Sequence, residues 1–249
     1  MAKVNGIIKI EGTVEDLTFY KKDGKNFVRK KGGISKERIM NDPNFVRTRE
    51  NGSEFGHCGS SGKVLKLAVG TMVFKAKDSK LSSRLLQVMS KIKNFDTTSK
   101  RGERNVAVGM ATSEGKLQLK GFDFNPKAPL KGVLFAPLTL NTSTGEVLIP
   151  NFIPIEQVQY PQGATHMSFQ SAAVLVDFET GLSESVYSTV ENVPISLTNT
   201  SVTLTPTNVP TGTGVQLFLI LISFYQEVNG MQYSLKNEEF NVLHVLEVV

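Results

Sequence analysis

The chain has 249 residues, of which 40% are hydrophobic and 20% charged, and this length is sufficient to bury a core without disulfide bonds. Its single cysteine, Cys58, excludes an internal disulfide framework and a cysteine-rich zinc site. No apolar run approaches the roughly 18 residues of a membrane helix, and the first residues lack the basic and apolar segments of a signal peptide. We therefore expect a protein that is cytoplasmic, or released as part of a particle, without membrane insertion.

Charge is divided unevenly along the chain. Residues 1–131 contain 27 Lys and Arg against 13 Asp and Glu, whereas residues 132–249 contain one Lys against ten Asp and Glu. The two parts therefore carry net charges of +14 and −9. Such an asymmetry indicates either a polyanionic partner or association driven by charge. We expect the basic part to attract nucleic acid or the acidic part of another copy of the chain.

The first thirty residues are predicted to form β-structure. Residues 7–10 are apolar, and two strand-like runs, 17–20 and 26–29, flank the turn sequence KDGK at 22–25. Asp-Gly between two such runs predicts a hairpin, because the turn needs a positive φ at both central residues. We expect Leu17, Phe19 and Phe27 on one face of it. Basic side chains surround the turn: Lys21, Lys22, Lys25, Arg29, Lys30 and Lys31.

The segment from residue 35 to 93 has helical patterns. Ser35 is a possible cap, and Asp42-Pro43 is typical of a helix start. Small residues recur at Gly52, Gly56, Gly59 and Gly62, which would form one stripe on a helix and permit close packing of another backbone. Because each glycine costs roughly 1 kcal/mol in a helix interior, a flexible loop at 51–63 is the alternative. Apolar residues at helical spacing predict a clearer helix from residue 81 to 92, and residues 100–112 are expected to hold a shorter one.

From residue 116 onward the pattern predicts strands. Short apolar runs alternate with turn sequences such as Asn229-Gly230, which marks a second hairpin. This rhythm is typical of an antiparallel β-sandwich of the immunoglobulin-like kind. The two prolines in residues 125–129 indicate a connecting segment, because proline lacks a backbone donor and restricts the residue before it. We therefore predict an α+β, mainly β, fold with a basic region at 1–125, containing a hairpin and helices, and an acidic β-sandwich domain at 130–249.

Residue patterns that support catalysis are weak. The sequence GHCGSSGK at 56–63 resembles a phosphate-binding loop, but His57 stands where that motif needs its first glycine and Val64 where it needs a hydroxyl. His57 and Cys58 are neighbours, so their side chains point apart on a helix or a strand, which disfavours a nucleophile–base pair. We expect no catalytic site, no metal and no cofactor, and hence no enzyme.

Clusters of basic residues are the candidate contacts with a polyanion or an acidic partner. Phe19, Tyr20 and Phe27 lie among the first clusters, a mixture that stacking and phosphate contacts use, although aromatic residues in a hairpin also pack inward. No DNA-reading motif accompanies them. The candidate residues are Lys21, Lys22, Lys25, Arg29, Lys30, Lys31, Arg47, Arg49, Lys100, Arg101 and Arg104.

Several segments resemble an uncharacterised protein family common in Bacteroidota, with similar length and order of segments. These are GTVEDLTFY at 12–20, VRKKGG at 28–33, DPNFVRTRENGSEFG at 42–56, residues 99–106 and FYQEVNG at 224–230. The resemblance covers nearly the whole chain. It implies membership of that family but neither an activity nor functional residues.

Two functions follow as hypotheses. The first is a non-catalytic structural subunit that self-assembles into a filament, tube or virus-like particle. Opposite charges suit head-to-tail contacts, which grow open polymers when they do not close, and the strand-like ends at 4–10 and 242–249 are candidates for pairing with a neighbour. Pairing within the chain is the alternative for both ends. The second function is nucleic-acid binding through the basic part, with strong salt dependence.

Overall fold

We describe a computed structural model of the protein, covering residues 2–3, 10–76, 78–235 and 239–249. The chain divides into two compact units, Met1–Arg49 and Glu50–Val249. Helix and antiparallel strand occur in roughly equal shares. The mixed class is therefore confirmed, whereas the expected predominance of β-structure is wrong, because residues 46–133 hold more helix than their patterns predicted.

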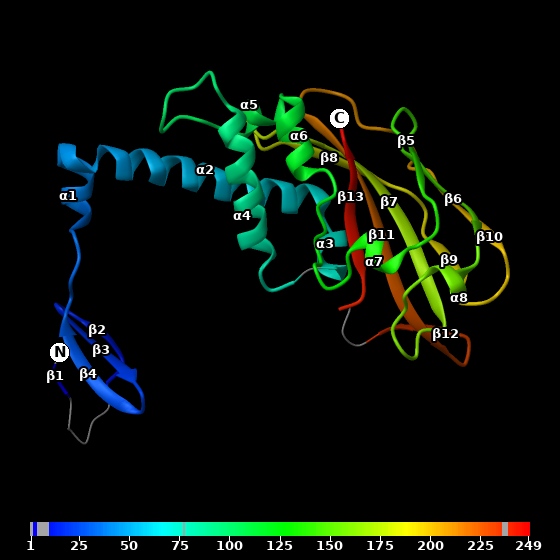
Figure 1. The fold of residues 1–249 in the computed structure, drawn as a ribbon, viewed down its shortest axis with the longest axis horizontal. Helices are drawn as coiled ribbons and strands as arrows, with labels where there is room; N and C mark the ends of the chain where they lie inside the picture. Colours follow the sequence, from blue (N-terminus) through cyan, green and yellow to red (C-terminus); the bar gives the residue numbers. More distant parts are fainter. Residues whose placement is uncertain (1, 4–9, 77, 236–238) are drawn as a thin grey trace. The chain divides into compact units, whose positions relative to one another are not determined.

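The first unit is built on a four-stranded antiparallel sheet with the order β1-β4-β3-β2 (Figure 1). Its strands are β1 (Ala2–Lys3), β2 (Gly12–Val14), β3 (Leu17–Lys22) and β4 (Lys25–Lys30). Asp23 and Gly24 have φ angles of 51° and 74°, which confirms the predicted hairpin. The strand expected at 7–10 lies almost entirely outside the described residues.

Two short helical segments complete this unit, and both begin as the sequence predicted. The Ser35 side chain accepts a hydrogen bond from the Arg38 backbone amide and caps α1 (Lys36–Asn41). Asp42 caps the 3-10 helix η1 (Pro43–Phe45) by accepting from the Asn44 amide at 2.9 Å. Such caps satisfy backbone donors that the helix itself leaves free.

Helices dominate the first part of the second unit. Residues 51–63 are helical, since they lie within α2 (Val46–Val69). The helix predicted at 81–92 is confirmed as α4, and the shorter one expected within 100–112 is α5. The helical elements after α2 are α3 (Met72–Lys75), α4 (Leu81–Ile92), η2 (Lys93–Phe95), α5 (Val106–Met110), α6 (Ser113–Leu119), α7 (Leu130–Val133) and α8 (Pro154–Gln157).

The strand predicted from residue 116 is wrong. That stretch belongs to α6, which Thr112 caps by accepting from the Gly115 amide at 3.0 Å. Leu119 is fully buried while Leu117 is largely exposed. Only one of the two leucines therefore reaches the core, and their spacing of two was misread as strand alternation. Residues 130–133, which also lie in the part of the chain predicted to form strands, form α7.

The acidic half contains two antiparallel sheets. The larger one is centred on β11 (Val215–Val228) and β7 (His166–Val176), and β12 (Met231–Ser234) and β13 (Val242–Val248) pair with the other side of β11. On the outer side of β7 lie β8 (Ser183–Tyr187) and β9 (Glu191–Pro194). The smaller sheet has the order β10-β6-β5, formed by β10 (Thr200–Leu204), β6 (Glu146–Phe152) and β5 (Thr139–Asn141). Positive φ angles at Asn229 and Gly230 confirm the second predicted hairpin.

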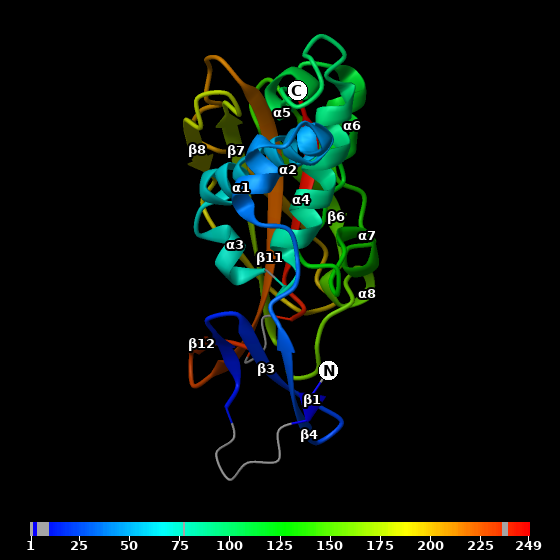
Figure 2. The same cartoon turned by 90° about the vertical axis from the view of Figure 1, so that its left-hand side faces the viewer.

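The larger sheet is buried on both faces. One face carries Leu217, Leu219 and Leu221, which share a core with residues of α2 and α4, and the other carries Ile220 and Ile222, which share a second core with the smaller sheet. Figure 2 shows α2 and α4 in front of this sheet. Burial on both sides explains the continuous apolar run in β11. Because helices cover one face, an immunoglobulin-like sandwich is not confirmed.

Residues on both sides of the expected 125–130 boundary belong to the second unit. The segment before it is tied to the C-terminal strand: Phe124 donates its amide to the Leu243 carbonyl at 2.8 Å, and Val245 donates to Phe122 at 3.0 Å. With β11 on its other side, β13 is paired within the chain. Pairing of this strand with a neighbouring molecule is therefore not available in this structure.

Candidate interaction surfaces

The four-stranded N-terminal sheet presents two different faces. Residues opposite each other on paired strands share a face, and successive residues alternate. Phe19 is opposite Val28, and Tyr20 is opposite Phe27. Phe27 therefore lies on the face opposite to Leu17 and Phe19, so the expectation that these three residues share a face is wrong. The predicted Asp23-Gly24 turn causes the difference, because it places Lys22 opposite Lys25 and hence Tyr20 opposite Phe27.

The first face, which we call the apolar face, consists of Val14, Leu17, Phe19 and Val28. Val14 is opposite Leu17 on the neighbouring strand, and these two side chains are 54% and 44% exposed. By the same alternation, Lys21 and Lys30 stand on this face at its two ends. The apolar face is therefore a small uncovered apolar strip with a lysine at either end.

The second face, which we call the aromatic face, carries Thr18, Tyr20, Lys22, Lys25, Phe27 and Arg29. The rings of Tyr20 and Phe27 are stacked at a centroid distance of 5.8 Å, and the Arg29 guanidinium lies 5.5 Å from the centre of the Tyr20 ring. Three cationic side chains thus surround one pair of aromatic rings. Sequence reasoning found these residues but not their common face.

No side chain in the described part of the first unit is buried. A small sheet is stable by itself only when it has three or more strands with a hydrophobic face or packs against a helix, and in the described part of this unit the apolar side chains remain accessible to water. This unit is also basic, with twelve Lys and Arg against six Asp and Glu in residues 1–49. Within the described residues, the hairpin lysines 21, 22, 25, 30 and 31 make no ion pair.

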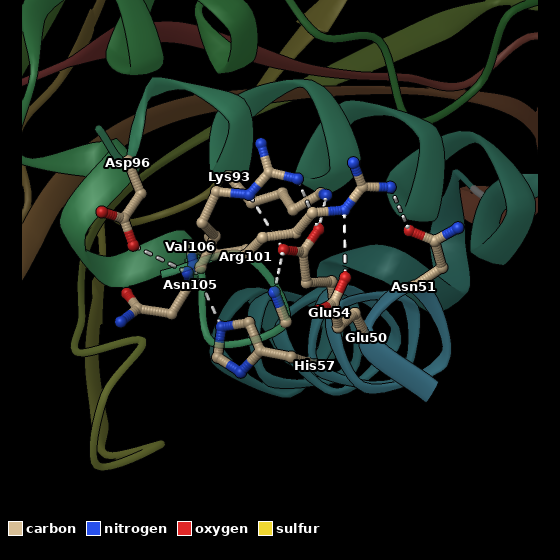
Figure 3. A network of polar contacts seen from close by, with 11 residues as sticks. Glu50, Asn51, Glu54, His57, Lys93, Asp96, Arg101, Asn105 and Val106 are labelled. Carbon is tan, nitrogen blue, oxygen red and sulfur yellow. Dashed lines mark hydrogen bonds and ion pairs between the residues drawn. The ribbon is translucent and has the colours of Figure 1, made fainter. Parts of the chain in front are cut away.

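The basic residues of the second unit are arranged differently, because they hold its own structure together. Glu54 of α2, only 2% exposed, receives two hydrogen bonds of 2.8 Å from Arg104, one of 2.8 Å from the Gly102 amide and an ion pair from Lys93 (Figure 3). One turn earlier, Glu50 pairs with Arg101 at 3.3 Å. The loop 96–105 is thereby fastened to α2.

Electrostatics in this network stabilise the ionised carboxylates. The hydrogen bond from Arg104, aided by Lys93 and Gly102, outweighs burial and lowers the pKa of Glu54 to about 2. Burial alone would raise the pKa of Asp96, but hydrogen bonds from Ser99, Asn105 and Thr98 hold it well below its ordinary value. Both groups are therefore charged at neutral pH. The Glu54 network, which the sequence pattern did not reveal, is structural in character.

The candidate basic residues outside the hairpin fall into two groups: some are held by contacts within the chain, and others are exposed. Arg101 and Arg104 are engaged as described, and Arg49 donates to the backbone carbonyls of Ile39 and Asp42. Arg47 and Lys100 are exposed, and Arg47 has a further interaction of its own. Among the basic candidates, the hairpin thus holds the largest group of exposed side chains.

The glycine stripe of α2 approaches another helix only at one end. A Cβ atom at Gly62 would lie 3.4 Å from the Leu85 Cβ of α4, whereas Gly52 and Gly56 have open space around them and Gly59 only reaches 4.0 Å from Leu86. The expected close packing along all four glycines is therefore wrong for Gly52 and Gly56.

Two helical glycines outside this stripe, Gly109 and Gly115, are more crowded than its members. A Cβ atom at Gly109 would lie 2.2 Å from the Ile92 carbonyl oxygen, and one at Gly115 would lie 2.0 Å from the Gly109 carbonyl oxygen. Helices α5 and α6 thus approach neighbouring backbone too closely for any side chain there. Both glycines are isolated in the sequence and form no spacing that would have revealed them.

A second surface, which we call the acidic edge, is formed by β8, β9 and the turn before β8. It carries Glu179, Glu184 and Glu191, all exposed. Two other acidic side chains of residues 132–249 pair with lysines: Glu239 with Lys127 and Glu247 with Lys120. Within the described residues, the three glutamates of the acidic edge have no cationic partner.

The polar groups considered for catalysis have other partners. His57 accepts a hydrogen bond from the Val106 amide at 2.9 Å through Nε2, so Nδ1 carries the proton, and burial lowers its pKa. Cys58 is buried, which raises the pKa of its thiol and disfavours the nucleophilic thiolate. In the described parts of the chain, no three His, Cys, Asp or Glu side chains group as metal ligands would.

Comparisons with known proteins give no assignment. No protein-family profile matches the chain, and no curated protein or solved structure is significantly similar to it. The resemblance to a family of Bacteroidota therefore stays a prediction. None of the helices formed by the described residues has the length and apolar character of a membrane span.

Proposed function

We propose that the protein is a non-catalytic structural subunit that assembles with copies of itself, and that the N-terminal sheet of one copy binds the acidic edge of the next. The observation that carries the proposal is the uncovered apolar face on a sheet without a buried side chain in its described part. Covering that face removes apolar surface from water, at roughly 25 cal/mol for each Å² buried. A second copy supplies the missing cover.

Charge complementarity favours the acidic edge as the occupant of the apolar face. Lys21 and Lys30 stand at the two ends of that face. Glu184 of β8 and Glu191 of β9 lie on two strands that follow each other along the same edge of β7, and the described residues offer them no cationic partner. A cleft of about 370 Å³ beside β8 is lined by Leu175, Leu182 and Glu184, among other residues. Its leucines and its glutamate are complementary in chemistry to an apolar strip that ends in lysines.

The two surfaces are different, so the contact is heterologous. Such a contact repeats from copy to copy and builds a ring if the rotation closes, or an open filament or tube if it does not. Among the described strands, β8 pairs only with β7, so its outer edge is able to accept a further strand. Both features support a polymer over a symmetric dimer.

Sedimentation velocity with negative-stain imaging, across protein concentration and salt, tests this proposal. We expect regular assemblies at low salt that dissolve as salt rises, because exposed charge pairs are screened beyond about 10 Å at 0.1 M ionic strength. Leu17→Asp places a charge on the apolar face and should abolish assembly. Thr18→Asp, the adjacent position on the opposite face, is the matched control and should leave assembly unchanged.

Two results would contradict the proposal. One is a protein that stays monomeric at every protein and salt concentration. This result is also expected if the N-terminal sheet binds another part of its own chain. The other is equal assembly of the Leu17→Asp and Thr18→Asp variants, which would show that the apolar face is not the contact.

A further inference from the structure

The proposed assembly contact involves the apolar face and leaves the residues of the aromatic face without a role. Its stacked rings, Tyr20 and Phe27, are partly exposed in the middle of the sheet, and Lys22, Lys25 and Arg29 surround them. We propose that this face binds single-stranded nucleic acid, with bases stacked on the two rings and phosphates held by the three cationic side chains.

The two aromatic rings lie close together and nearly parallel. Tyr20 and Phe27 are directly opposite on β3 and β4, and their planes are inclined by 23° to each other. Aromatic side chains on the open face of a small antiparallel sheet stack bases in single-strand-binding modules. Such stacking accepts any base, because every base has a π-face. A duplex is disfavoured, since its bases already stack on one another.

The cations are placed where a backbone running past the rings would pass. Lys22 is opposite Lys25 at the turn, and Arg29 is opposite Thr18 on the other side of the rings. The Arg29 guanidinium, 5.5 Å from the Tyr20 ring centre, has a planar shape that suits both phosphate and base faces. Phosphates are thus within reach on both sides of the ring pair.

Other basic groups serve this purpose less well. Arg101, Arg104 and Lys93 are engaged with Glu50 and Glu54, and binding a phosphate would require breaking those pairs. The nucleic-acid hypothesis therefore narrows from the whole basic part of the chain to one face of its N-terminal sheet. This face is opposite to the apolar face, so the inference does not depend on self-assembly.

Fluorescence anisotropy with the full chain tests the inference, using labelled oligothymidine, labelled oligouridine and a labelled duplex. Nanomolar protein keeps the measurement independent of assembly. We expect tighter binding of single strands than of the duplex. Tyr20→Leu and Phe27→Leu should each weaken binding about 5- to 150-fold, which corresponds to the usual loss of one stacked base. Phe19→Leu, the same kind of change on the apolar face, should have no effect.

The salt dependence gives a second readout that does not disturb the packing of the rings. Lys22→Gln should reduce the slope of log affinity against log salt by about 0.7, the value for one phosphate contact on a single strand. Lys21→Gln, on the apolar face, should leave the slope unchanged. Binding of either DNA or RNA strands with these differences supports the proposal, and the stronger binder identifies the source of the strand. Equal affinity of wild type and the Tyr20→Leu and Phe27→Leu variants, or equal binding of the duplex, would overturn it.

Discussion

Removal of the buried negative charge of Glu54 should destabilise the second unit strongly. The difference between the ordinary pKa of 4.5 and about 2 corresponds to roughly 3 kcal/mol in favour of the ionised group in the folded state. Loss of one partner in a buried ion pair costs about 3–5 kcal/mol, but Arg104 keeps 28% of its side chain exposed. We therefore expect Glu54→Gln to lower the free energy of unfolding by about 2–3 kcal/mol.

The lowered pKa of Glu54 also predicts how the stability difference between wild type and the Glu54→Gln variant changes with pH. Since the folded state lowers the pKa of Glu54, its stabilisation is complete above the unfolded value of 4.5 and is lost as pH falls toward 2. The glutamine side chain in the Glu54→Gln variant does not titrate. The stability difference between wild type and variant should therefore be constant from neutral pH down to about 5 and should narrow at lower pH.

Urea denaturation followed by circular dichroism, on the full chain at a series of pH values, measures both effects. Glu50→Gln is the matched control, because Glu50 is one helical turn earlier and its partner Arg101 is 50% exposed. An exposed pair of this kind contributes at most about 1 kcal/mol. Equal losses for the two variants, or a difference that does not narrow below pH 4.5, would refute the structural role of the Glu54 network.

Packing of the glycines and of the first unit gives three further predictions. Gly56→Ala should raise the free energy of unfolding by about 1 kcal/mol, since the new methyl group meets open space on a helix. Gly109→Ala should lower it by about 1–3 kcal/mol, because its Cβ atom would meet the Ile92 carbonyl; urea denaturation checks both, and equal effects would contradict the packing described. Trypsin should first remove the first unit, which ends at Arg49 and has no buried side chain in its described part. Mass spectrometry of the resistant fragment identifies the cut, and early cleavage within residues 50–249 would contradict the division.

Features set by neighbouring residues could be predicted from the sequence. Asp23-Gly24 and Asn229-Gly230 each specify a turn with positive φ at both positions, and the helix at 81–92 follows from its apolar spacing. The caps at Ser35 and Asp42 are equally local. In each case the physical cause lies within a few residues of the element that it determines.

Features set by distant residues could not be predicted. Arg104 reads as an exposed phosphate ligand in the sequence, yet its partner Glu54 stands fifty residues earlier. The composition change near residue 125 suggested a boundary, but α4 and β11 share one core. The hairpin and its turn were predicted correctly, but Phe27 was assigned to the wrong face, since this turn places it opposite Tyr20.

An exchange of charges between the two proposed surfaces tests self-assembly most directly. One variant carries Lys21→Glu and Lys30→Glu on the apolar face, and another carries Glu184→Lys and Glu191→Lys on the acidic edge. Each variant alone presents like charges at every contact, whereas a mixture in which the two variants alternate presents opposite charges at every contact. Light scattering with negative-stain imaging should show no assembly of either variant alone and assembly of the mixture. A mixture that scatters no more than its separate components would contradict the account.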